Sequence, residues 1–147
     1  MKLYHCSPYN QKQLQPGFNH TGVEVHWDKT ESNRWLYATA DEELALMMGY
    51  ASFLEKTLNV EQFITEGKKI TVRVDKQPTD KEVTTRLYLY QLDNNATDAW
   101  VKVNNKYNNA DSEYKTKNKV GYKSIRPILI SPDKLHALGY QLTFVTS

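Results

Sequence analysis

The pattern of apolar and polar positions predicts one main helix. Acidic residues at Asp41, Glu42 and Glu43 stand where a helix N-terminus favours negative charge, and Asp41 is a suitable N-cap. Downstream of them, apolar residues recur at three- and four-residue spacing, which is typical of an amphipathic helix. They are Leu44, Met47, Met48, Ala51, Leu54 and Leu58. We therefore expect a helix over about residues 41–58, with its apolar stripe packed against a sheet.

Alternating apolar and polar residues predict several strands. The alternation is clearest over residues 69–74 and 84–92. Further strands are expected at 2–6, 34–39, 100–103, 124–130 and 140–145, and a short helix after Ser131-Pro132. Residues 22–27 are either a short strand or an ordered loop, while the Asn-rich stretch 104–118 predicts a loop. The sequence therefore predicts an α+β fold in which antiparallel strands surround one early helix.

Length and composition limit the possibilities further. The chain has 147 residues, 39% of them hydrophobic, which suits a single domain over residues 1–147 with one modest core. A net charge of +2 does not on its own indicate nucleic acid or membrane as a partner. Cys6 is the one cysteine, so an internal disulfide and a cysteine-rich zinc site are excluded. We see no signal peptide and no membrane span, and we expect a cytoplasmic protein.

Three short segments carry candidate chemistry, and we expect their residues His5, Tyr37 and Glu113 to come together on one face of the domain. Leu3-Tyr4-His5-Cys6-Ser7 resembles the Tyr-His-Gly-[Ser/Thr] strand of ADP-ribosyltransferases of the diphtheria-toxin and poly(ADP-ribose) polymerase branch. Leu36-Tyr37-Ala38-Thr39-Ala40, followed by a helix, is similar to the tyrosine-bearing strand of that branch. Asp111-Ser112-Glu113-Tyr114 resembles the acidic strand start of its small bacterial and phage relatives, and Val120 and Ile125-Arg126-Pro127-Ile128 also fit them. The resemblance covers most of the chain in order and spacing, and it implies split antiparallel sheets with the main helix packed on them.

The resemblance implies that NAD is the substrate and that ADP-ribose is transferred to a macromolecular acceptor, either protein or nucleic acid. His5 would hydrogen-bond the adenosine ribose hydroxyls, and Tyr37 would stack on the nicotinamide. Glu113 would accept a hydrogen bond from the nicotinamide ribose and stabilise an oxocarbenium-like transition state. Cys6, Ser7 and Thr39 complete the expected NAD-binding set. Nicotinamide leaves as a neutral molecule, so the reaction requires neither a metal nor a general acid.

The chain departs from the family pattern at two positions. Cys6 stands where the family usually has glycine, so its backbone groups could still hold the nicotinamide amide, but its thiol could crowd the pocket. Ala45 stands where many relatives have a serine that binds the same amide, and Thr39 and Ser52 are the candidate substitutes.

The sequence also leaves the acid, the phosphate contacts and the function open. Asp111 and Glu82 are the rival acids to Glu113, and Arg34, Arg73 and Lys69 are the candidate contacts for the pyrophosphate. A non-catalytic domain of the same fold that binds a nucleotide or a protein is an alternative function, motivated by Cys6 and Ala45. A further alternative is an RNA 2′-phosphotransferase, although the chain has no obvious arginine cluster for the RNA phosphate.

Overall fold

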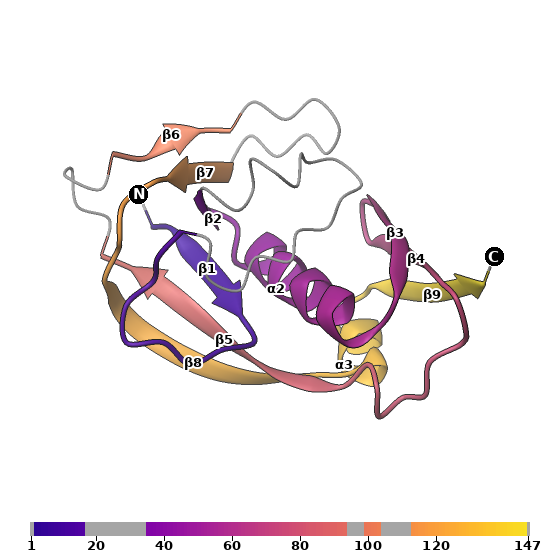
Figure 1. Cartoon of the computed structure of the whole chain (residues 1–147). Helices are drawn as coiled ribbons and strands as arrows, with labels where there is room; N and C mark the ends of the chain where they lie inside the picture. The colour runs from indigo at the N-terminus through magenta and orange to yellow at the C-terminus, as the bar shows by residue number, and fades with distance from the viewer. Residues whose placement is uncertain (1, 17–34, 94–98, 104–112, 147) are drawn as a thin grey trace.

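The protein is an α+β fold in which one long helix lies between two β-sheets (Figure 1). This computed structural model describes residues 2–16, 35–93, 99–103 and 113–146. A six-stranded sheet has the order β6-β7-β2-β1-β5-β8, and a three-stranded sheet has the order β3-β4-β9. The six-stranded sheet is antiparallel throughout, as the sequence predicts, whereas β9 runs parallel to β4.

The strands are short at one end of the larger sheet and long at the other. In chain order the bounds are β1 Tyr4–Ser7, β2 Leu36–Thr39, β3 Val60–Glu66, β4 Lys69–Val74, β5 Thr85–Leu92, β6 Val101–Lys102, β7 Glu113–Thr116, β8 Tyr122–Ile130 and β9 Gln141–Thr146. The two helices are α2, Glu42–Thr57, and α3, Pro132–Ala137.

Helix α2 begins and ends as its sequence predicts. The Asp41 carboxylate accepts hydrogen bonds from the backbone N–H groups of Glu43 and Leu44, which satisfies two donors that have no partner within the helix. The helix ends at Leu58, whose backbone is extended. Its buried side chains pack against both sheets, and each large apolar one contributes about 1.5–3 kcal/mol on burial. The predicted helix over residues 41–58 is therefore confirmed.

A second apolar cluster covers the opposite face of the six-stranded sheet. It contains Leu3, Leu36, Ala38 and Tyr90, and it is closed by Leu14. The backbone of Leu14 pairs with that of Val120 through two hydrogen bonds of 3.0 and 2.9 Å. The central strands are thus buried on both faces, which fixes the positions of β1 and β2.

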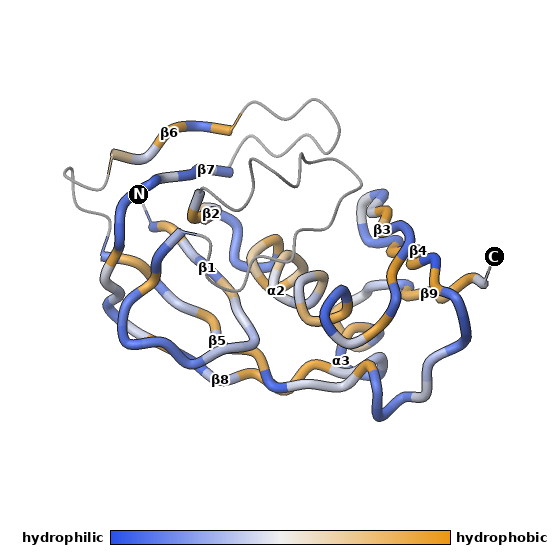
Figure 2. Tube along the Cα trace, in the orientation of Figure 1, coloured by the Kyte–Doolittle hydropathy of each residue, from blue (hydrophilic) through white to orange (hydrophobic). Residues whose placement is uncertain are grey.

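Two elements differ from the sequence-based expectation. The strand β3 was not predicted, because the run Val60–Glu66 has four exposed or half-exposed polar residues among its apolar ones. The prediction of a loop over residues 104–118 is wrong at its end, where β7 forms although most of its residues are hydrophilic (Figure 2). Neighbouring strands on both sides supply the hydrogen bonds that hold β7. The predicted segment 22–27 lies outside the described residues.

Gly49 lets α2 approach β1 closely, and we expect Gly49→Ala to destabilise the protein. A Cβ atom at position 49 would lie 2.6 Å from the Cys6 Sγ atom and 3.0 Å from the Cys6 carbonyl carbon. Overpacking of this kind costs about 1–3 kcal/mol, which urea denaturation would measure. The double variant Cys6→Ala/Gly49→Ala should recover part of the loss. Equal stability of wild type and Gly49→Ala would contradict the close packing described here.

Candidate active site

The sheet places the three predicted segments side by side. Strand β2, which carries Tyr37, lies between β1, which carries His5, and β7, which begins at Glu113. Thr39 is the registered partner of both Tyr4 in β1 and Glu113 in β7. Antiparallel pairing therefore brings together residues that are more than a hundred positions apart in the sequence.

Glu113 is the most unusual side chain in this region. It is fully buried, and neither of its carboxylate oxygens has a hydrogen-bond partner among the described residues. Burial raises the pKa of its carboxyl group from 4.5 to about 7. A buried carboxyl group without a partner is costly and rare, so its presence points to a functional role.

Backbone contacts on both sides hold Glu113 in place. Its carbonyl accepts a hydrogen bond of 2.9 Å from the N–H of Val103, next to β6. On the other side it pairs with Thr39, which is also fully buried. The carboxyl group is therefore carried by the first residue of a paired strand and not by a solvated loop.

Glu113 shares one face of the sheet with alternate residues of β7 and of the neighbouring strand β2. Directly opposed residues of antiparallel strands point to the same face, so Thr39 lies beside Glu113, and Tyr37 lies beside Lys115. Trp35 lies two residues before Tyr37. The ammonium groups of Lys115 and Lys117 lie over its ring, at 4.3 and 4.8 Å from the ring centroid. We call Trp35, Lys115 and Lys117 the lysine–tryptophan cluster.

His5 contacts the site through the backbone of β2. Its Nδ1 atom lies 2.7 Å from the carbonyl oxygen of Tyr37. Because a carbonyl oxygen only accepts, Nδ1 is the donor, and in the neutral ring Nε2 is left as an acceptor. Burial lowers the pKa of His5, against a smaller opposite effect of the Tyr37 carbonyl, so the neutral ring is favoured. An acceptor nitrogen of this kind suits a hydroxyl donor, such as a ribose.

The side chain of His5 leaves β1 on the other face from Glu113. Tyr4 shares the face of Thr39, so the next residue points the opposite way, and the His5 ring lies 6.1 Å from the Tyr90 ring. This corrects the expectation that all three side chains share one face. Tyr4 and Thr39 form the one registered pair between β1 and β2. Next to this pair, the His5 imidazole donates a hydrogen bond to the Tyr37 carbonyl. His5 therefore reaches the Tyr37 segment across the gap between the two strands.

The other predicted NAD-binding residues have structural contacts. The Cys6 thiol is buried against Gly49 of α2, and burial raises its pKa to about 12, so it is a poor nucleophile. The Ser7 hydroxyl accepts from the Tyr9 N–H at 3.1 Å, and the Thr39 hydroxyl accepts from the Asp41 N–H at 3.1 Å. Thr39 thus links the face of Glu113 to the start of α2.

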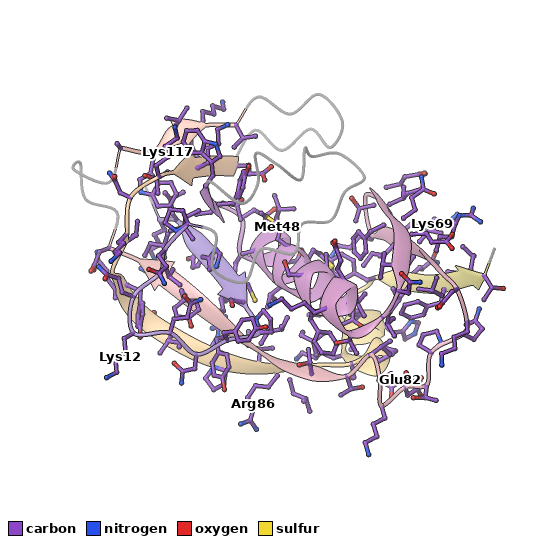
Figure 3. The ribbon with its side chains drawn as sticks, viewed as in Figure 1. Lys12, Met48, Lys69, Glu82, Arg86 and Lys117 are labelled. Carbon is purple, nitrogen blue, oxygen red and sulfur yellow. The ribbon has the colours of Figure 1, made fainter. Side chains whose placement is uncertain are left out.

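The structure separates the rival residues from the three segments. Glu82 is exposed in the turn between β4 and β5, where Thr79 donates to its carboxylate and lowers its pKa (Figure 3). Lys69 and Arg73 lie on β4 in the other sheet. Asp111 and Arg34 lie outside the described residues. On α2, Ala45 is buried and Ser52 donates to the Met48 carbonyl at 3.1 Å.

Sequence reasoning missed the lysine–tryptophan cluster. The signal was the two-residue period of Glu113, Lys115 and Lys117, which is typical of charged residues on one face of a strand. The Asn-rich composition of the preceding residues led instead to the prediction of a loop.

Other features of the described residues lie away from Glu113. A cavity of about 390 Å³ opens between the N-terminal turn of α2, β8 and α3, and the predicted site residues do not line it. Within the described ranges, no three His, Cys, Asp or Glu side chains are grouped to hold a metal ion. None of the helices in those ranges is long and apolar enough to cross a membrane.

Comparison of the chain with protein-family models, with curated protein sequences and with solved structures finds no match.

Proposed function

We propose that this protein is an NAD-dependent mono-ADP-ribosyltransferase with an ADP-ribosyltransferase-like fold. The observation that carries the proposal is the buried, unpartnered carboxyl group of Glu113 on the strand next to Tyr37. It is joined by the imidazole of His5, which is bonded to the Tyr37 carbonyl. These are the three residues that the family resemblance identifies, and the sheet order β7-β2-β1 supports their acting together.

The chemistry of each group suits NAD. The bond between nicotinamide and ribose breaks with development of positive charge on the sugar, and a buried carboxylate stabilises that charge. The Glu113 carboxyl group, with a pKa of about 7, ionises near neutral pH. Tyr37 offers an aromatic ring on the same face as Glu113. The imidazole of His5 reaches the gap between β1 and β2 from the other face, and its acceptor nitrogen suits a ribose hydroxyl. Nicotinamide would lie beside Tyr37, with the adenosine towards β1.

We expect Tyr37→Leu to raise the KM for NAD. Loss of one stacking partner worth about 0.5–1.5 kcal/mol corresponds to a rise of about two- to tenfold. Release of nicotinamide from NAD, measured at several NAD concentrations, tests this expectation. Tyr37→Phe is the matched control, since it keeps the ring, and its KM should stay close to that of the wild type.

Two results would count against the proposal. An equal KM for Tyr37→Leu and the wild type would remove nicotinamide stacking from the site. Tight binding of ADP-ribose in a calorimeter without any NAD turnover would instead favour the non-catalytic, nucleotide-binding alternative.

A further inference from the structure

If the protein has the proposed function, the sheet also indicates where the acceptor of ADP-ribose approaches the site. If NAD extends from Glu113 and Tyr37 towards β1, the donor occupies the side of β2 that faces β1. Strand β7 lies on the other side of β2. The acceptor must then approach Glu113 along β7.

The surface along β7 is basic and partly aromatic. Lys115 and Lys117 follow Glu113 at two-residue intervals on the same face, and both ammonium groups are held against the ring of Trp35. The indole face attracts the cations, so two positive charges are concentrated at one point. Val101 of β6, opposite Lys115, is 48% exposed, so this face is open to solvent beside the lysines.

The positive charge is concentrated in this part of the chain. Residues 113–126 contain five of the 19 lysine and arginine residues, and Glu113 is their one acid. The whole chain has a net charge of only +2. Two of these cations, Lys115 and Lys117, lie against an aromatic ring, and this combination is complementary to a phosphate backbone.

We propose that the lysine–tryptophan cluster docks a single-stranded nucleic acid, and that this strand is the acceptor of ADP-ribose. Phosphates bind at Lys115 and Lys117, and the next nucleotide extends along β7 to Glu113. A single strand is favoured over a duplex because Glu113 is fully buried, and only an unstacked nucleotide is slender enough to enter.

The reaction balances without a further reactant. A hydroxyl or amino group of the nucleotide attacks C1′ of the nicotinamide ribose, and the bond from C1′ to the nicotinamide nitrogen breaks. The bonding electron pair leaves with nicotinamide, which becomes neutral. The proton of the attacking group passes to the ionised carboxylate of Glu113.

Fluorescence anisotropy with labelled single-stranded DNA and RNA of about 20 nucleotides tests the docking surface. We expect Lys115→Gln/Lys117→Gln to weaken binding by about tenfold. The slope of log Kd against log salt concentration should be smaller for this variant than for the wild type by about 1.4. Each of the two lost phosphate contacts on a single strand contributes about 0.7 to this slope. The matched control is Lys69→Gln/Arg73→Gln, which removes the same charge from β4, at the other end of the molecule (Figure 3).

Equal weakening by the two double variants would overturn the proposal, because the effect would then reflect net charge alone. Lack of binding by the wild type would overturn it as well. Circular dichroism spectra of both variants show whether the fold is retained, and Lys117→Gln alone, at an exposed position, provides a second test with little risk to the fold.

Transfer of label from NAD separates this inference from the proposed function. Labelling of the oligonucleotide that depends on the two lysines supports both. Labelling of protein but not of oligonucleotide overturns the acceptor assignment and leaves the transferase intact. Lysine-dependent binding without consumption of NAD refutes the transferase and supports the nucleic-acid surface.

Discussion

Glu113→Gln is expected to lower the rate of NAD consumption by at least about a hundredfold. The variant keeps the size of the side chain but removes the negative charge that would stabilise the sugar cation and receive the proton of the acceptor. For the wild type, kcat/KM should rise with pH to a plateau above about pH 7, because the carboxylate is the active form and burial raises the pKa of Glu113 to about 7. Nicotinamide release measured from pH 5 to pH 9 tests both expectations.

Glu82→Gln is the matched control, since Glu82 is an exposed acid in a turn far from β7. Its activity should equal that of the wild type. If Glu113→Gln consumed NAD as fast as the wild type, Glu113 would have no role in the reaction, even though NAD is consumed.

The second large effect concerns stability and does not depend on the proposed activity. Burial raises the pKa of Glu113 from 4.5 to about 7, so the folded protein holds a proton that the unfolded chain has lost. The stabilising contribution is therefore complete below about pH 4.5 and is lost as the pH rises to about 7. The wild type should lose about 3 kcal/mol of unfolding free energy over this range through this one group.

Urea denaturation of the wild type and Glu113→Gln at pH 4.5, 6 and 8 measures this contribution. The difference in unfolding free energy between the two proteins should shift in favour of the variant as pH rises, because other titrating groups are common to both. A difference that is constant with pH would mean that the carboxyl group is solvated and not buried.

Local patterns were sufficient to predict the helix and most strands. The acids at the start of α2 and the apolar repeat after them act within one element, so the N-cap at Asp41 and the packed stripe follow from neighbouring residues. The strand alternation at β4 and β5 is equally local. Strand β7 could not be predicted in this way, because its stability comes from partners far away in the sequence.

The same distinction applies to the site. The sequence resemblance selected His5, Tyr37 and Glu113, but it could not predict which face each side chain occupies. That depends on the register between β1, β2 and β7, since a shift by one residue reverses the face. The burial of Glu113 and the convergence of two lysines on Trp35 are also consequences of this register.

The parallel pairing of β4 with β9 has a consequence for how the chain acquires its shape. Thr71 lies opposite Thr143, so the smaller sheet is completed by a segment that leaves the ribosome long after its neighbour. Until then, the apolar side chains of Ile70, Val72 and Val74 lack one flank of their final surroundings. The smaller sheet can therefore be completed only after β9 has been synthesised, and its closure joins segments far apart in the sequence.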